Sequence, residues 1–251
     1  MTEGRSLSVE YAPHLWTAIH RPSGDDPAPV MVVMVPGGAW RTADPGGFGG
    51  LAEYLADHGF TALRIEIGAA EDGVRYPEPV EDIHCAVGYA AALAVEEGLD
   101  PVALILLGHS SGAHLAALAA STTLPISAHC PHDPALADAL IGLAGPYDVS
   151  QAANAAQALF GVTLDEDPDL WAEGNPVNHV GVRPDVDVLL MHGDADDVVP
   201  VSFTHQYADA LEAAGHETRV EIVPDADHHA IYSANVVGPA IVDWIEKRGT
   251  R

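Results

Sequence analysis

Residues 102–112 read VALILLGHSSG. The first six are apolar and long enough for a buried strand, and the last five match the pattern G-x-S-x-G. This pattern places a serine on a tight turn from strand to helix, where glycines let the two backbones approach closely. The alanine-rich residues 111–121 are suited to that helix. The stretch therefore predicts that Ser110 stands where a base can reach its hydroxyl.

Similar apolar runs lie on both sides of this strand. They cover residues 30–35, 60–67, 139–144, 186–191 and 218–223. Helical patterns separate them, at residues 50–58, 79–97, 202–214 and 234–247. Alternating strands and helices predict an α/β fold with a mostly parallel central sheet and helices on both faces. Residues 7–20 are expected to form a hairpin-like antiparallel edge.

Length and charge limit the classes of partner. The 251 residues suit one domain over 1–251, and 48% hydrophobic residues exclude wholesale disorder. The formal net charge is −27, which repels nucleic-acid backbones and anionic lipid. We therefore expect no nucleic-acid or membrane partner. The acidity is interpreted as a solubility device, with a role in choosing substrates as the alternative.

The cysteines and the N-terminus indicate the compartment. Cys85 and Cys130 are the only cysteines, which is too few for a disulfide framework, and Cys85 is expected to be a core thiol. The first residues lead into no apolar signal segment, and no apolar run approaches the length of a membrane span. The sequence thus favours a reducing cytoplasm.

Residues 150–180 interrupt the alternation of strands and helices. They are longer than a crossover helix needs and contain Phe160, Trp171 and a run of acidic residues. We interpret them as a small lid insertion of one or two helices, with an ordinary surface insertion as the alternative. Trp171, together with Trp40, is expected to line a substrate pocket, although core packing suits each tryptophan equally well.

A serine nucleophile needs a histidine base and an acid that orients it. In chain order the acid and then the base should follow later strands. Residues 192–200 follow the strand at 186–191 and offer Asp194, Asp196 and Asp197. Residues 224–229 follow the last strand and offer His228 and His229. Because the carboxyl ends of parallel strands share one edge of a sheet, the three groups can meet there.

A glycine pair after residues 30–35 can supply an oxyanion hole. Backbone N–H groups of Gly38 and Ala39, with that of Ser111, could hold the negative oxygen of a tetrahedral intermediate. The alternative is a plain glycine turn beside a core Trp40.

Together these motifs resemble the α/β-hydrolase fold, and within it the esterase and lipase group of hormone-sensitive-lipase-like carboxylesterases and kynurenine-formamidase-like enzymes. The matching segments are PGGAWR at 36–41, YP at 76–77 with ED at 81–82, GHSSGAHL at 108–115, GPYD at 145–148, NP at 175–176 and HGDADDVVP at 192–200. The resemblance implies that Ser110 is the nucleophile, Asp196 the acid and His228 the base. Asp194, Asp197 and His229 remain rivals.

The chain departs from that group at two places. Pro36 replaces the usual histidine before the glycines, and residues 64–67 lack the common Tyr-Arg pair. We also expect no long N-terminal cap of the kind that the hormone-sensitive-lipase-like enzymes have. These departures affect the inferred substrate more than the reaction type.

The expected function is a serine hydrolase that cleaves a small carboxylic ester through an acyl-enzyme. The first alternative is an arylformamidase that hydrolyses a small amide, and a lesser one is a non-catalytic binding protein. We expect no cofactor and no metal, since the tract HCPHD at 129–133 lacks a matching partner group for zinc. A homodimer is the assembly considered. His114 is expected to pack behind the site rather than to take part in the reaction.

Overall fold

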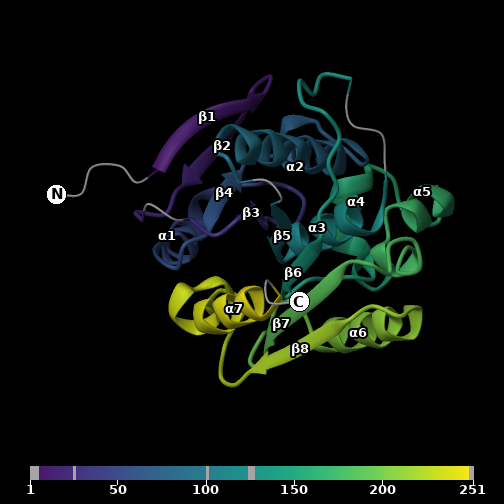
Figure 1. Ribbon diagram of the computed structural model, residues 1–251. Coiled ribbons are helices and arrows are strands. Elements are labelled where there is room, and N and C mark those ends of the chain that lie inside the picture. The colour runs from purple at the N-terminus through teal and green to yellow at the C-terminus, as the bar shows by residue number, and fades with distance from the viewer. Residues whose placement is uncertain (1–5, 25–26, 100–101, 124–127, 249–251) are drawn as a thin grey trace.

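A single eight-stranded sheet organises the computed structural model, which describes residues 6–24, 27–99, 102–123 and 128–248. The strand order is β1-β2-β4-β3-β5-β6-β7-β8 (Figure 1). The strands are β1 (Ser6–Ala12), β2 (Leu15–His20), β3 (Val30–Val35), β4 (Thr61–Ile65), β5 (Ala103–His109), β6 (Ala139–Leu143), β7 (Asp187–Gly193) and β8 (Thr218–Val223). β1 and β2 pair antiparallel and β2 joins β4 antiparallel, whereas β3 to β8 pair in parallel. The predicted mostly parallel sheet with an antiparallel edge is confirmed.

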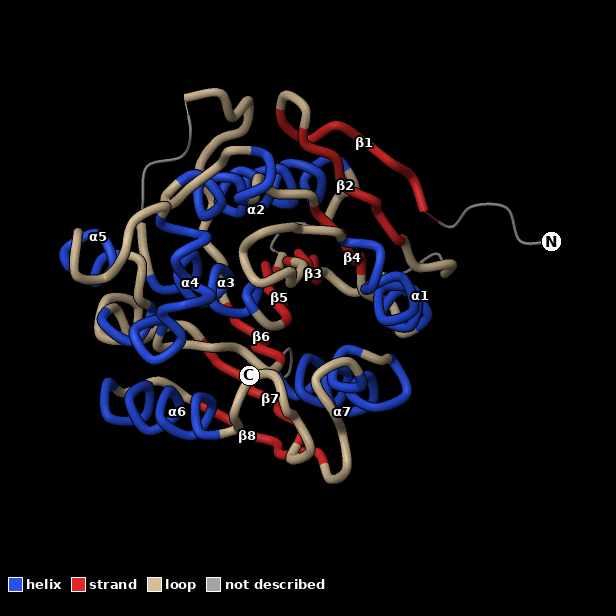
Figure 2. The backbone as a smooth tube through the Cα atoms, turned by 180° about the vertical axis from the view of Figure 1, so that it is seen from behind, coloured by secondary structure: helices blue, strands red, loops and turns tan. Residues whose placement is uncertain are grey.

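Helices cover both faces of this sheet, as the alternating pattern predicted. α1 (Gly49–Asp57) and α7 (Ala234–Arg248) pack together on one face. α2 (Glu78–Glu96), α3 (Ser111–Ser121) and α6 (Ser202–Ala214) cover the other face, as Figure 2 shows from behind. Each layer buries its own apolar cluster against the central strands, and the nearly complete burial of β3, β5 and β6 explains their continuous apolar sequences.

The segment between β6 and β7 is a short helical insertion. It contains η3 (Val149–Ala152), α4 (Ala153–Phe160), α5 (Pro168–Glu173) and η4 (Pro176–Asn178). The remaining 3₁₀ helices are η1 (Pro45–Phe48), η2 (Ala70–Asp72) and η5 (Ala230–Tyr232). α4 and α5 lie beyond α3, on the sheet face opposite α1 and α7 (Figures 1 and 2).

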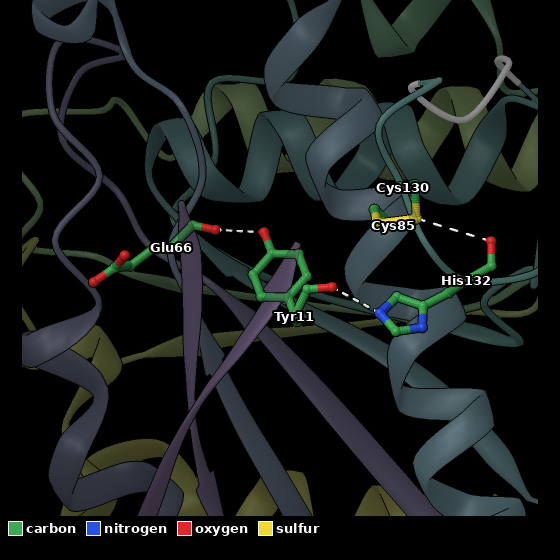
Figure 3. Close-up of a disulfide and its surroundings, with 5 residues drawn as sticks. All are labelled: Tyr11, Glu66, Cys85, Cys130 and His132. Carbon is green, nitrogen blue, oxygen red and sulfur yellow. Dashed lines mark hydrogen bonds between the residues drawn. A yellow bond between two sulfur atoms is a disulfide. The ribbon is translucent and has the colours of Figure 1, made fainter. Parts of the chain in front are cut away.

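The prediction of two free thiols is wrong. Cys85 on α2 and Cys130 form a disulfide with their Cα atoms 5.6 Å apart (Figure 3). Cys85 is buried in the core as expected, but the loop before β6 brings Cys130 over it. In the same loop His132 Nε2 lies 2.7 Å from the carbonyl oxygen of Tyr11 on β1, so the loop is tied to both α2 and the sheet edge.

Within the described ranges, no helix is both long and apolar enough to cross a bilayer. The same residues contain no cluster of three or more side chains arranged to bind a metal ion.

Candidate active site

The turn between β5 and α3 holds Ser110 in a conformation that the neighbouring glycines allow. Ser110 has φ of 55°. A Cβ atom at Gly108 would lie 2.4 Å from the carbonyl oxygen of Gly112, and one at Gly112 would lie 2.3 Å from that of Val35. Only glycine therefore fits at both positions, and the tight turn presents Ser110 at the carboxyl edge of the sheet.

Three loops bring Ser110, His228 and Asp196 into one hydrogen-bonded line. The Ser110 hydroxyl can donate to His228 Nε2, with a separation of 3.0 Å between the two atoms. His228 Nδ1 donates to Asp196 Oδ2 at 2.7 Å. These are the distances that a nucleophile, a base and an orienting acid require.

The Asp196 side chain is inaccessible to solvent, and both of its carboxylate oxygens accept hydrogen bonds. Its Oδ1 accepts hydrogen bonds from the N–H groups of Val198 and Val199 at 2.9 and 2.8 Å. Burial by itself raises the pKa of Asp196, but the bonds from His228 and these two backbone groups outweigh burial and lower it. Asp196 is therefore ionised, which is the state that holds the proton of His228 on Nδ1.

The rival residues do not join this line. Asp194 Oδ1 accepts a hydrogen bond from the N–H of Asp225 and so connects two surface loops. Asp197 is exposed. The exposed His229 places its ring centroid 5.9 Å from that of His228.

The loop after β3 lies against the Ser110 turn. A Cβ atom at Gly37 would lie 2.9 Å from the carbonyl oxygen of His109, so glycine is needed for this approach. Gly38, Ala39 and Trp40 all have positive φ, of 148°, 52° and 58°. Residues other than glycine rarely adopt this region, and the two that follow Gly38 require outside support. Pro36, Gly37, Gly38 and Ala39 of this loop line the cavity that contains Ser110.

Three buried histidines support the loops around Ser110. His109 Nε2 donates to the carbonyl oxygen of His228 at 2.9 Å. His192 Nε2 donates to the carbonyl oxygen of Val199 at 2.8 Å and accepts from Thr204 at Nδ1. His114 contacts Trp40 and Gly174.

These three histidines are neutral. Burial lowers the pKa of His109 to about 3 and that of His114 to about 4, and it also lowers the pKa of His192. For His109 the neighbouring His228 adds to the effect of burial. Sequence reasoning did not identify His109 and His192 as supports, although each is a polar residue at the end of an otherwise apolar strand beside a motif glycine.

Two cavities flank Ser110. The first, of about 390 Å³, is lined by Asp44, Phe48, His228, His229 and Tyr232 as well as by Ser110. The second, of about 480 Å³, is lined by Trp40, Phe203 and residues 150–155 of the insertion. The exposed Val198 borders both.

The two tryptophans expected in the pocket have different positions. Trp40 lines the second cavity. Trp171 is 2% exposed, packs on Phe160 with ring centroids 4.3 Å apart, and lines neither cavity. The pocket role expected for Trp171 is thus replaced by core packing, because the insertion folds its aromatic side chains onto one another.

Comparison with known proteins identifies the family of this chain. A family model described as BD-FAE matches residues 18–211. Esterase LipC of Mycobacterium tuberculosis (strain ATCC 25618 / H37Rv) is 30% identical over 201 residues, which cover 74% of this chain and 49% of that protein. Esterase LipQ of the same organism is 28% identical over 243 residues, covering 87% and 55%. The chain thus spans about half the length of these curated relatives.

Solved structures show the same fold. A truncated carbohydrate esterase from gut microbiota superimposes with a TM-score of 0.82 at 21% identity, covering 98% of this chain and 96% of that one. The propionate-bound esterase Est2 of Thermogutta terrifontis gives 0.76 at 21% identity, covering 96% and 94%.

Proposed function

The chain belongs to the BD-FAE family and has the α/β-hydrolase fold of esterases, and from this premise we propose that it is a serine carboxylesterase acting on small esters. The observation that carries the proposal is the hydrogen-bonded line from Ser110 through His228 to Asp196. Its curated relatives are named esterases.

In the proposed reaction His228 takes the proton of Ser110 while the serine oxygen attacks the ester carbonyl. Asp196 stabilises the resulting imidazolium. N–H groups of Gly38, Ala39 and Ser111 hold the negative oxygen, and each such donor is typically worth about 3 kcal/mol. His228 then protonates the departing alcohol, and the acyl group remains on the serine.

Water completes the cycle. It gives a proton to His228 and attacks the acyl-enzyme, after which the serine leaves and regains its proton from His228. The carboxylic acid is released, and the residues named here return to their starting states without a cofactor.

The same chemistry orients the substrate between the two cavities. The leaving oxygen must face His228 Nε2 to receive its proton, and His228 lines only the first of the two cavities. We therefore place the alcohol beside Asp44 and Tyr232, and the acyl group beside Trp40 and the insertion. On this assignment residues 150–155 form one wall of the acyl site, which is the role we propose for the expected lid.

A fluorophosphonate probe and short-chain nitrophenyl esters test the proposal. Wild type should be labelled once and hydrolyse the esters, whereas Ser110→Ala should do neither. Ser8→Ala, at an exposed position on β1, should behave as wild type. Equal rates for wild type and Ser110→Ala, with neither labelled, would refute the mechanism.

Substrate preference separates the ester from the amide alternative. Turnover of acetyl and butyryl esters is compared with that of N-formylkynurenine on the same enzyme. A higher kcat/KM for the formamide would assign the site to amide hydrolysis. Ester turnover that depends on Ser110 would exclude the non-catalytic binding protein.

The location expected from the sequence needs revision. The cytoplasm was inferred from two cysteines that make no disulfide framework and from the lack of an apolar signal segment, but the two cysteines are joined. Disulfides persist mainly in oxidising compartments, so we propose that this chain works outside a reducing cytoplasm. Thiol alkylation of the protein isolated from its native cells tests this: two labelled thiols without prior reduction would favour the cytoplasm.

A further inference from the structure

We propose that His114 is a positioning residue that sets the geometry of the oxyanion loop through Trp40. This inference rests on the proposed esterase function and extends it to a residue that does not touch the substrate. His114 lies on α3, four residues after Ser110, with none of its surface exposed.

The hydrogen bonds of His114 fix its tautomer. The indole N–H of Trp40 can only donate, and it lies 3.1 Å from His114 Nδ1. Nδ1 must therefore be unprotonated, so the ring proton is on Nε2. That proton is donated to the carbonyl oxygen of Gly174 at 2.9 Å. Both ring nitrogens are satisfied only in this neutral form.

The loop that contacts His114 needs support from outside. Ala39 and Trp40 both have positive φ, a conformation that is unfavourable for residues with a Cβ atom. The carbonyl oxygen of Trp40 accepts from the N–H of Ala70 at 3.0 Å, which secures the backbone on one side. His114 secures the side chain, meeting the indole ring edge-on with centroids 5.3 Å apart.

The position of the Trp40 side chain affects catalysis through the peptide that precedes it. Ala39 supplies one of the proposed oxyanion donors and is bonded directly to Trp40. If the indole loses its acceptor, the cost of the two left-handed residues is no longer offset, and the N–H of Ala39 can turn away from the cavity. Small errors in the aim of such a donor reduce stabilisation of the transition state more than binding of the substrate.

Two substitutions of His114 each keep one of its two hydrogen bonds and remove the other. His114→Asn keeps a side-chain oxygen near the place of Nδ1, so it can still accept from Trp40, but it cannot reach Gly174. His114→Gln keeps a donor near the place of Nε2 and loses the acceptor for Trp40. Trp40→Phe removes the donor from the other side.

We expect His114→Gln and Trp40→Phe each to lower kcat by about 10- to 100-fold, a fraction of the loss for a whole oxyanion donor, with KM changed less than threefold. Affinity for an alkyl boronic acid, which forms a tetrahedral adduct with the serine, should fall in parallel with kcat. His114→Asn should stay within about threefold of wild type. The double variant His114→Gln/Trp40→Phe should be no slower than the slower single variant.

His84→Gln is the matched control. His84 is also a buried histidine, but it lies on α2 and its Nε2 has no hydrogen-bond partner in the described structure. It should show an unchanged kcat even if its melting temperature falls.

Wild-type kcat in both His114→Gln and Trp40→Phe would overturn the inference, as would a rise in KM alone or an equal loss of kcat in His84→Gln. Since Trp40→Phe tests the same contact from the partner side, the test survives a His114 variant that does not fold. A wild-type enzyme without esterase activity would instead refute the proposed function.

Discussion

Two regions of this molecule are held together by different chemistry. The catalytic edge comprises the loops that follow β3, β5, β7 and β8, and buried neutral histidines hold it through hydrogen bonds. The disulfide side comprises α2 and the loop at residues 130–132, which a covalent bond joins, and β1, which a hydrogen bond from His132 ties to that loop. Hydrogen bonds fix direction as well as distance, whereas a disulfide mainly restricts the unfolded chain. Changes at the first region should therefore alter the rate of catalysis, and changes at the second should alter stability alone.

The largest effect should come from Asp196→Asn on the catalytic edge. An amide cannot hold the proton of His228 on Nδ1, and the corresponding change in a serine protease lowers kcat about 10⁴-fold. The side chain keeps its shape, so the melting temperature should fall by only a few degrees. Steady-state kinetics and thermal unfolding measure the two quantities.

Asp194→Asn is the control for that variant, because Asp194 lies on the same loop but bonds to the N–H of Asp225 instead. A comparable loss of kcat in Asp194→Asn would mean that the acid has been assigned to the wrong residue.

Acid should weaken the catalytic edge. His109 and His114 have folded pKa values of about 3 and 4, below the ordinary value of 6.5. The unfolded chain therefore binds more protons below pH 6.5, and stability falls as the pH falls. Between pH 7 and 5 each histidine should remove about 2 kcal/mol of unfolding free energy. Urea denaturation at pH 7, 6 and 5 measures the loss.

His84 contributes to this loss from outside the catalytic edge, since burial lowers its pKa to about 4 as well. The variant His84→Gln should keep the part of the acid-induced loss of unfolding free energy that is due to His109 and His114. Unfolding free energies independent of pH in this variant would show that the catalytic edge is not acid-sensitive.

Removing the disulfide should change stability without changing catalysis. Cys85 and Cys130 are separated by 45 positions in the sequence, and bonds closing loops of such length typically contribute about 4 kcal/mol. The variant Cys85→Ala/Cys130→Ala should lose about that much unfolding free energy while kcat stays within twofold. A tenfold fall in kcat at a temperature where the variant is folded would break the division between the two regions.

Dithiothreitol provides the matched comparison. It should destabilise wild type to a similar extent and leave the double variant unaffected.

The smallest effect concerns Asp82, on the same helix as Cys85. Burial raises its pKa to about 6, despite the hydrogen bond that it accepts from the N–H of Gly68 at 2.8 Å. Its folded form therefore binds more protons between pH 3.8 and 6, so its contribution to stability is lost as the pH rises, opposite in sign to the histidines. Asp82→Asn should raise the unfolding free energy by about 3 kcal/mol at pH 8 and by almost nothing at pH 3.5.

Glu96→Gln, at an exposed position on the same helix, should leave the unfolding free energy unchanged at both pH 8 and pH 3.5. An equal gain for Asp82→Asn at both pH values would show that charge is not its cause.

The sequence predicted the catalytic edge better than the disulfide side for a physical reason. Ser110, Asp196 and His228 each follow a strand of a parallel sheet, and the carboxyl ends of such strands share one edge. Strand periodicity therefore fixes their approximate positions. Cys130 lies in a loop and Trp171 on the six-residue helix α5, and neither segment is long enough to show a periodicity that indicates what its side chain will face. The way these segments pack determines both the disulfide of Cys130 and the buried position of Trp171, and neither contact has a local signal in the sequence.

The bond between Cys85 and Cys130 also closes a covalent ring, and the ring contains β5, the Ser110 turn and α3. A protease that cuts the backbone once between these cysteines cannot release either fragment, because the sulfur atoms still connect them. The nicked molecule keeps its mass on a non-reducing gel and divides into two bands only when a reductant is added. A single cut in the segment that contains Ser110 therefore leaves the two pieces of this chain covalently joined.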